Sequence, residues 1–432
     1  MKEQEQIPTG KVQRAGKFIA TGAKIGTNYL KHYGKKLINS EVSKDELHED
    51  NARDIYQSLS QLKGSALKVA QMLSMDKNLL PTAYQQQFAK AQYTAPPLSY
   101  PLVVKTFVNQ FGKKPEEVFE TFTKNAVNAA SIGQVHQATI GLTKYAVKIQ
   151  YPGVGDSVKS DLAMVKPIAL RMFDLNVNDY NEFIQEVETR LLEETDYQLE
   201  LKRSIELSHK SGHIKNLLFP TYFPALSGSK ILTMDWIDGK PLGELLKSKI
   251  EEPLNHTLGQ AMWDFYHHQM HQLKAVHADP HPGNFIVSPE GKLGVIDFGC
   301  VKEMSDDFYK KYFRLLNPAL LENKKELEEA FFDLRFIYDD DTKQERDFFI
   351  KTFSHLVELL GRPFRTNTFD FSDKAYFAEI YTFGEELSKM KELRESKKAR
   401  GVKDALYINR TYFGLYSILH DMQAKVNTTL SL

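Results

Sequence analysis

Two polar segments, 277–284 and 297–299, constrain this chain more than any other feature. The residues between them are predicted to form a short hairpin that brings the two segments together. The first segment is His277-Ala278-Asp279-Pro280-His281-Pro282-Gly283-Asn284. An apolar run at 285–287, a turn at 288–291 and a second apolar run at 293–296 follow, and the last run ends in Asp297. Two short strands joined by a turn form a β-hairpin, so Asp297 returns beside Asn284. Mg²⁺ prefers oxygen ligands, which makes Asn284 and Asp297 the predicted metal ligands.

The spacing inside this region matches a known catalytic arrangement. Asp279 precedes Asn284 as in the H-R-D-x-x-x-x-N loop of protein kinases, and Asp297-Phe298-Gly299 follows. Phosphoryl transfer uses such residues to hold Mg²⁺ against phosphates and to accept a proton from a hydroxyl or water. We therefore predict ATP and Mg²⁺ as cofactors and Asp279 as the proton acceptor. The alternative is a transition-metal site made by His277, Asp279 and His281.

A second hairpin is predicted around a turn at 141–144. Small residues before its first strand would let backbone N–H groups approach phosphate oxygens. The second strand carries Lys148 in an Ala-Val-Lys-Ile context, like the kinase lysine that pairs with nucleotide phosphates. The predicted nucleotide contacts of the first strand and the residues before it are Ala129, Ala130, Ser131, Ile132, Gly133 and Gln134.

Three acidic residues, Glu194, Asp196 and Glu200, are candidates to pair with Lys148. A helix from residue 181 places Phe183, Val187 and Leu191 on one face, and Glu194 continues that face toward the core. A buried carboxylate needs a cation, so Glu194 can pair with Lys148 as in the kinase Lys–Glu pair. Asp196 lies close by, and Glu200 can take the partner's role instead. The alternative is an acidic surface patch.

Residues 231–234 are predicted to form a strand, and the chain turns out of it at 235–239. In a kinase-like fold the chain crosses between lobes here and meets the adenine. Asp235 and Ile237 are predicted nucleotide contacts by position alone.

A helix is predicted over 55–81, with apolar residues at steps of three and four. Its opposite face carries Gly64, Lys68 and Gln71, which periodicity alone indicates to be solvated. Gly64 would cost about 1 kcal/mol relative to Ala in a helix interior unless another group approaches closely.

Composition excludes several functions. The 432 residues contain 56 Lys and Arg against 56 Asp and Glu, so nothing indicates nucleic-acid binding. The sequence shows no apolar run of membrane-spanning length and no secretory signal, and we expect a cytoplasmic protein. Residues 1–36 nevertheless carry seven Lys and one Arg against two Glu. This basic segment could contact an anionic membrane peripherally, form a mobile leader or pack on its own protein.

Taken together, these motifs resemble the UbiB/AarF family of atypical protein-kinase-like proteins from about residue 50 onward. Two positions depart from the family pattern: Ala70 replaces a usual Gly, and Asn128 replaces a common third Ala of the Ala-rich loop. The matching segments are Lys68-Val69-Ala70-Gln71 for the K-x-G-Q helix, Ala129-Ala130-Ser131-Ile132-Gly133-Gln134 for the Ala-rich loop, and Glu194-Thr195-Asp196 for the E-x-D motif.

The resemblance implies an α+β, bilobal protein-kinase-like fold. We expect a basic segment at 1–50, a helical extension at 51–110, a small β-rich N-lobe at 111–235 and a helical C-lobe at 236–432. It also implies that Lys68 and Gln71 face the active site, which gives Glu194 a second possible cation in Lys68 and leaves Glu200 for Lys148. The family binds nucleotide with Mg²⁺, has ATPase activity and supports isoprenoid-quinone or other prenyl-lipid metabolism at membranes. It phosphorylates proteins in trans poorly.

The segment after Gly299 agrees with that last point. Five residues separate it from Ser305-Asp306-Asp307, which is predicted to cap a new helix. So short a connection cannot form a kinase activation loop. Two other classes remain open: a small-molecule phosphotransferase of aminoglycoside or choline kinase type, and a low-turnover nucleotide-dependent lipid-binding module.

Overall fold

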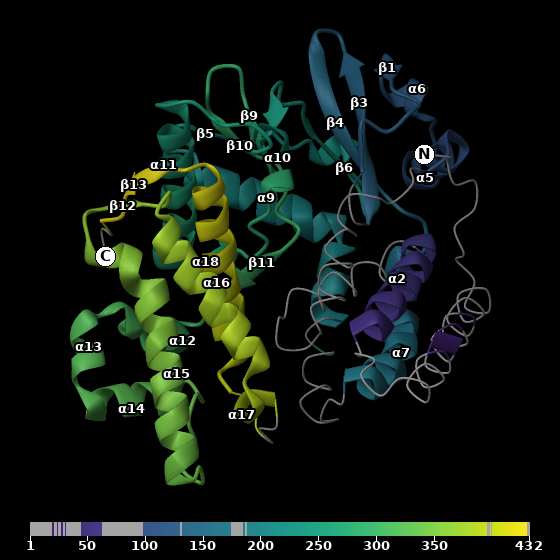
Figure 1. Ribbon diagram of the computed structural model, residues 1–432. Coiled ribbons are helices and arrows are strands. Elements are labelled where there is room, and N and C mark those ends of the chain that lie inside the picture. The colour runs from purple at the N-terminus through teal and green to yellow at the C-terminus, as the bar shows by residue number, and fades with distance from the viewer. Residues whose placement is uncertain are drawn as a thin grey trace. The chain divides into compact units, whose positions relative to one another are not determined.

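A computed structural model describes residues 20, 24, 27–28, 31, 45–62, 98–129, 132–173, 185, 188–394, 398 and 400–429. The chain divides into two compact units, whose elements Figure 1 labels. Unit 1 contains Met1–Lys202 and Thr221–Trp236, and unit 2 contains Arg203–Pro220 and Ile237–Leu432. Within the described residues, no helix combines the length and hydropathy needed to cross a bilayer.

Unit 1 is built on an antiparallel five-stranded sheet. The strand order is β1-β3-β4-β6, and β2 pairs with β3 beside β1. The predicted hairpin forms the centre of this sheet, with Gly141 supplying the positive φ of 57° that its tight turn requires. The strands are β1 (Thr121–Phe122), β2 (Asn128–Ala129), β3 (Gly133–Ile140), β4 (Thr143–Gln150) and β6 (Ile231–Asp235).

Helices cover the core of unit 1. Helix α5 begins with a proline in its first turn and ends where Gly112 adopts a left-handed conformation, both common helix boundaries. Its face packs Val103 and Phe107 into a core with Val147 and Ile149 of β4. The helices of this unit whose bounds are described are α2 (Asp45–Leu62), α5 (Tyr100–Phe111), α6 (Pro115–Val118), α7 (Val154–Phe173), the start of α9 (Tyr197–Ser211) and the 3₁₀ turn η2 (Pro224–Leu226).

The described residues of unit 2 form three small sheets. Two of them shape the predicted catalytic region: a four-stranded sheet in the order β5-β10-β9-β7, and the two-stranded pair β11-β8. The third pairs β12 with β13. The strands are β5 (Leu217–Leu218), β7 (Lys240–Pro241), β8 (Ala275–His277), β9 (Phe285–Val287), β10 (Leu293–Val295), β11 (Val301–Glu303), β12 (Thr368–Asp370) and β13 (Lys425–Asn427).

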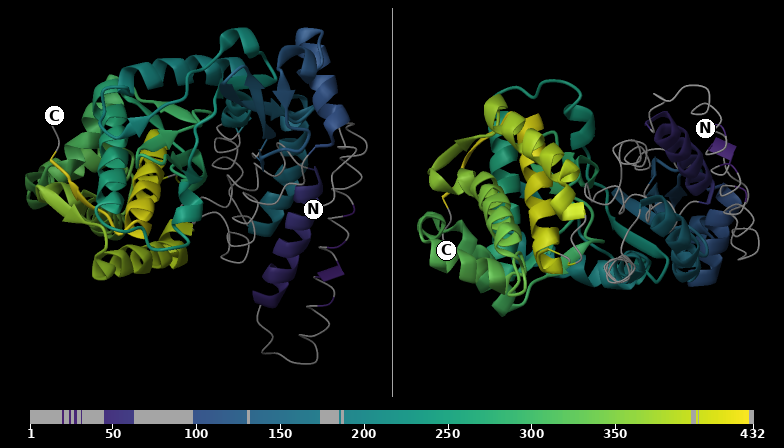
Figure 2. Two further views of the ribbon diagram at one scale, coloured as in Figure 1. Left: turned by 90° about the horizontal axis from the view of Figure 1, so that it is seen from above. Right: turned by 60° about the horizontal axis from the view of Figure 1, so that its bottom comes forward.

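The rest of unit 2 is helical. Helices α15, α16 and α18 pack side by side, as the green and yellow ribbons of Figures 1 and 2 show. The aromatic side chains of Trp263, Tyr412 and Tyr416 are buried between helices. The α-helices are α10 (Leu242–Leu245), α11 (Leu254–His267), α12 (Asp306–Phe313), α13 (Pro318–Glu322), α14 (Lys324–Asp333), α15 (Lys343–Gly361), α16 (Lys374–Lys389), α17 (Lys391–Arg394) and α18 (Lys403–Asp421). This unit also contains the π-helix η3 (His268–Leu273) and the 3₁₀ turns η4 (Pro282–Asn284), η5 (Arg314–Leu316) and η6 (Arg362–Arg365).

The predicted cap of the helix that follows Gly299 is confirmed. The Ser305 hydroxyl accepts the Phe308 N–H at 3.2 Å and caps α12. The pairing of β12 with β13 was not predicted, because its two strands are three residues each and more than fifty residues apart in sequence.

Candidate active site

Strand β4 places Lys148 inside unit 1. Lys148 lies opposite Val135 of β3 and Leu232 of β6, so both neighbouring strands fix its position. Its ammonium contacts Glu200 Oε1 of α9 at 2.7 Å, and the two side chains are 8% and 2% exposed. The ammonium also lies over the Tyr197 ring, 5.2 Å from its centroid. Glu200, one of the acids considered from sequence, is therefore in direct contact with Lys148.

The helix break at Thr195-Asp196 separates the roles of the other two acids. Asp196 accepts the N–H groups of Gln198 and Leu199 at 3.1 and 3.0 Å, so it caps α9. Glu194 ends the preceding helical turn and is buried, as the apolar face of that helix predicted. The Thr195 carbonyl accepts a hydrogen bond from the buried Gln150 side chain, which ties this corner to β4.

Gly133 opens β3 at a position where a side chain would not fit. A Cβ at Gly133 would lie 2.5 Å from the Ile149 carbonyl oxygen and 2.7 Å from the Tyr197 hydroxyl. Ile132, one residue earlier, is buried in the unit 1 core, and Ala129 pairs with Gln134 in the β2–β3 ladder. Ala130, Ser131, Lys68 and Gln71 lie outside the described residues.

The Gln134 side chain joins three segments of unit 1. Its oxygen accepts the Leu98 N–H at 2.6 Å, and its amide nitrogen lies 2.8 Å from His136 Nε2. The other ring nitrogen of His136 bonds the Thr123 carbonyl at 2.7 Å. Burial lowers the pKa of His136, so the imidazole stays neutral and serves this network without a buried charge.

In unit 2, a hydrogen bond between Asp279 and Asn284 closes the loop formed by the polar segment 277–284. The Asn284 amide nitrogen donates to the Asp279 carbonyl at 2.9 Å, and it lies 3.5 Å from an Asp279 carboxylate oxygen. The Ile296 N–H donates to the Asn284 carbonyl at 3.1 Å. Asn284 thus adjoins Asp279 on one side and the end of β10 on the other.

The predicted hairpin delivers Asp297 to the same place. Strands β9 and β10 pair in antiparallel register, with Phe285 opposite Val295, so Asn284 and Asp297 leave adjacent strand ends. One Asp297 oxygen accepts the Gly299 N–H at 2.8 Å, and a carboxylate can accept further bonds or bind a cation. Since the Asn284 nitrogen is engaged by Asp279, its amide oxygen is the atom suited to a cation. This donor set fits Mg²⁺, which takes oxygen ligands from few protein groups.

Buried side chains of α11 and η3 form hydrogen bonds with His277 at the start of the loop. The Tyr266 hydroxyl bonds His277 Nδ1 at 3.0 Å, and the Gln269 side-chain oxygen accepts the His277 N–H at 2.8 Å. Burial, and then the negative charge of Asp279, raise the pKa of Tyr266 well above its ordinary value, so the hydroxyl stays protonated. Tyr266 and Gln269 were not predicted as site residues, because helical periodicity marks them only as core.

The transition-metal alternative gains no support. His277 uses Nδ1 with Tyr266, and His281 Nδ1 accepts the Gly283 N–H at 3.1 Å. Among the described residues, the ligand atoms of His277, Asp279 and His281 do not gather at metal-binding distances.

The predicted adenine contacts lie where the chain passes from unit 1 to unit 2, between Trp236 and Ile237. The Asp235 carboxylate accepts the Thr221 N–H at 3.0 Å, and the Trp236 N–H donates to the Lys144 carbonyl at 3.0 Å. Both bonds fix the backbone that precedes this crossing.

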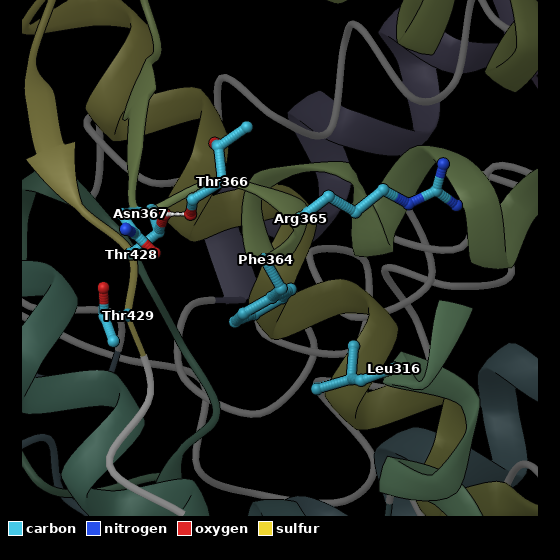
Figure 3. A pocket seen from close by; sticks show the side chains of 7 residues that line it. All are labelled: Leu316, Phe364, Arg365, Thr366, Asn367, Thr428 and Thr429. Carbon is cyan, nitrogen blue, oxygen red and sulfur yellow. Dashed lines mark hydrogen bonds between the residues drawn. The ribbon is translucent and has the colours of Figure 1, made fainter. Parts of the chain in front are cut away.

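A separate pocket of about 300 Å³ opens in unit 2 (Figure 3). Phe364 and Leu316 form its apolar side, Thr428 and Thr429 line another part, and the Arg365 guanidinium extends away from these threonines. None of its lining residues belongs to the predicted site.

Known proteins resemble this chain in sequence and in fold. Residues 90–331 match the ABC1 atypical kinase-like domain. The probable serine/threonine-protein kinase abkA of Dictyostelium discoideum is 24% identical over 98% of this chain and 79% of its own length. The mitochondrial atypical kinase COQ8 of Saccharomyces cerevisiae is 27% identical over 85% of this chain and 74% of its own. A solved structure of Rv3197 with erythromycin, from Mycobacterium tuberculosis, is 25% identical with a TM-score of 0.59, covering 89% of this chain and 96% of that one.

The fold and the matched domain define an atypical kinase-like protein, and the predicted α+β kinase-like fold is confirmed. The chain belongs to the UbiB/AarF family, whose members carry the ABC1 atypical kinase-like domain.

Proposed function

We propose that this protein binds ATP with Mg²⁺ and acts as an ATPase or phosphotransferase that supports isoprenoid-quinone or other prenyl-lipid metabolism. The observation that carries the proposal is the loop joining Asp279, Asn284 and Asp297 through the β9–β10 hairpin. Mg²⁺, when bound, supplies charge neutralisation on the phosphates.

In this proposal the chain's own residues have distinct tasks. Asn284 and Asp297 hold the metal, and Asp279 orients a hydroxyl or water and accepts its proton. Lys148, held by Glu200, pairs with the phosphates. Backbone groups from residues 129–134, with Asp235 and Ile237, contact the nucleotide. Lys68 is proposed to pair with the buried Glu194 carboxylate, and Gln71 is proposed to face the same active site.

The short connection from Cys300 to Met304 bears on the kind of substrate. Strand β11 occupies most of it and pairs with β8, so the chain returns directly to its own sheet before α12 begins. This arrangement supports a small molecule or prenyl lipid as acceptor and disfavours a docked protein substrate. The basic segment 1–36 is proposed to bring the enzyme to an anionic membrane surface.

The test is phosphate release by the purified full chain with Mg²⁺ and ATP, with and without anionic phospholipid vesicles and a phenolic quinone-precursor mimic. We expect release that increases with vesicles and the mimic. Phosphorylation of a soluble alcohol would instead favour a small-molecule phosphotransferase, and tight nucleotide binding without release would favour a lipid-binding module. Absence of both binding and release would refute the proposal.

A further inference from the structure

One face of α18 contacts the predicted catalytic loop and the segment after Gly299. Asp404, Tyr407, Arg410 and Gly414 follow at steps of three, three and four, so they share a side of the helix. This helix lies more than a hundred residues beyond the loop in sequence, and no sequence motif connected the two.

The first contact binds the short segment that follows Asp297-Phe298-Gly299. The Lys302 ammonium pairs with Asp404 at 2.6 Å and lies over the Tyr407 ring, 5.4 Å from its centroid. Lys302 stands at the centre of β11, opposite Val276 of β8. Since β8 leads into Asp279, α18 holds the strand pair from which the loop emerges.

The second contact reaches Asp279 itself. An Arg410 guanidinium nitrogen lies 3.5 Å from Asp279 Oδ1, and the two side chains are 27% and 22% exposed. The other carboxylate oxygen of Asp279, Oδ2, lies near the Asn284 amide nitrogen. Arg410 and Asn284 therefore engage the two oxygens of one carboxylate, which restricts rotation of the Asp279 side chain.

The third contact sets how closely the helix approaches. A Cβ at Gly414 would fall well inside van der Waals distance of the Pro280 ring. Pro280 directly follows Asp279, so the helix backbone packs on the loop at the residue next to the proposed proton acceptor. Only glycine permits this approach without moving the loop or the helix.

We infer that α18 supports the catalytic loop in place of an activation segment, and that Arg410 is a positioning residue that orients Asp279 for proton transfer. In a protein kinase, the segment after Asp-Phe-Gly controls assembly of the catalytic site. Here that segment is a five-residue connection, and the charged pair and the close glycine contact supply the support from a C-terminal helix. The inference rests on the proposed function for the identity of the reaction, and on the α18 contacts alone for the support of the loop.

The test compares Arg410→Met, which removes the charge, with Arg410→Lys, which keeps it, in the full-length protein. Arg314→Met is the matched control, because Arg314 forms a partly exposed ion pair with Glu326 in the same unit at 3.8 Å. For Arg410→Met we expect kcat for phosphate release to fall on the order of 10- to 100-fold, with KM for ATP changed less than about twofold. Arg410→Lys should retain more activity than Arg410→Met, and millimolar guanidinium should partly restore Arg410→Ala but leave Arg314→Ala unaffected.

Hydrogen exchange of residues 276–284 gives a readout that does not need turnover. Exchange there should accelerate in Arg410→Met and in Gly414→Ala, and it should match wild type in Arg314→Met. Unchanged exchange in Arg410→Met, or a wild-type kcat in that variant, would overturn the inference. A wild-type protein without turnover would refute the proposed function, and the exchange comparison would still decide whether α18 supports the loop.

Discussion

Removing one partner of the Lys148–Glu200 pair should destabilise unit 1 severely. At 2.7 Å, two unit charges attract by about 6 kcal/mol at an effective dielectric of about 20. Burial of both groups offsets most of that attraction, so the intact pair contributes little net stability. In Lys148→Met the carboxylate remains buried without its cation, and the free energy of unfolding should fall by about 3–5 kcal/mol.

Urea unfolding of the full chain measures this loss, and hydrogen exchange of residues 133–150 assigns it to unit 1. The double variant Lys148→Met with Glu200→Leu should recover most of the lost stability, since no isolated charge remains. Lys144→Met, an exposed change on the same strand, should stay within about 0.5 kcal/mol of wild type. If the single variant were as stable as Lys144→Met, or if the double variant were less stable than the single one, the reasoning about a buried pair would be wrong.

Three further outcomes are expected. Gly133→Ala should destabilise unit 1 by about 1–3 kcal/mol in urea unfolding, because its methyl group would overlap the Tyr197 hydroxyl; stability equal to wild type would mean the strand can shift freely. Burial lowers the pKa of His267 to about 3 and of His271 to about 4, while both titrate near 6.5 when unfolded, so the unfolded chain takes up the extra protons as pH falls. Unfolding of unit 2 at pH 5 should therefore be easier than at pH 7.5 by about 2 kcal/mol for each histidine, and equal or greater stability at pH 5 would contradict this. Ser305→Ala should cost about 1 kcal/mol through loss of the α12 cap, which thermal unfolding beside Ser305→Asp, expected to retain the cap, can measure.

Local signals in the sequence were sufficient for much of the catalytic loop. The hairpin between Asn284 and Asp297 follows from two short apolar runs and a turn, and the structure has it in that register. The cap at Ser305 is equally local, because one hydroxyl and the next few N–H groups decide it. Such features depend on neighbours within a few residues, and sequence patterns report these directly.

The choice of partner for Lys148 was not decided by sequence. Glu194, Asp196 and Glu200 lie within seven positions, and helical periodicity assumes a continuous helix through them. The helix is interrupted at Thr195 and Asp196, and Glu200 of α9 contacts Lys148 while Asp196 caps α9. This break is stabilised by a hydrogen bond from Gln150 of β4 to the Thr195 carbonyl, and helical periodicity cannot predict such a contact.

Contacts between distant segments were also beyond sequence patterns. Arg410 meets Asp279 across 131 positions, and the Gln134 side chain bonds the backbone of Leu98 across 36. Single residues carry these contacts, and a lone arginine or glutamine in a helix or strand resembles any solvated one. Only the packing of whole elements brings them to their partners.

Binding of ATP with and without Mg²⁺, by calorimetry on wild type and Asp297→Asn, tests the central proposal most directly. With Mg²⁺ we predict that Asp297→Asn weakens ATP binding at least tenfold, since it removes the carboxylate charge from the metal, while the two proteins bind alike in EDTA. Asp306→Asn, an exposed acid in the first turn of α12, should bind as wild type does. Equal Mg²⁺-dependent affinity in wild type and Asp297→Asn would contradict the assignment of this loop as a magnesium–nucleotide site.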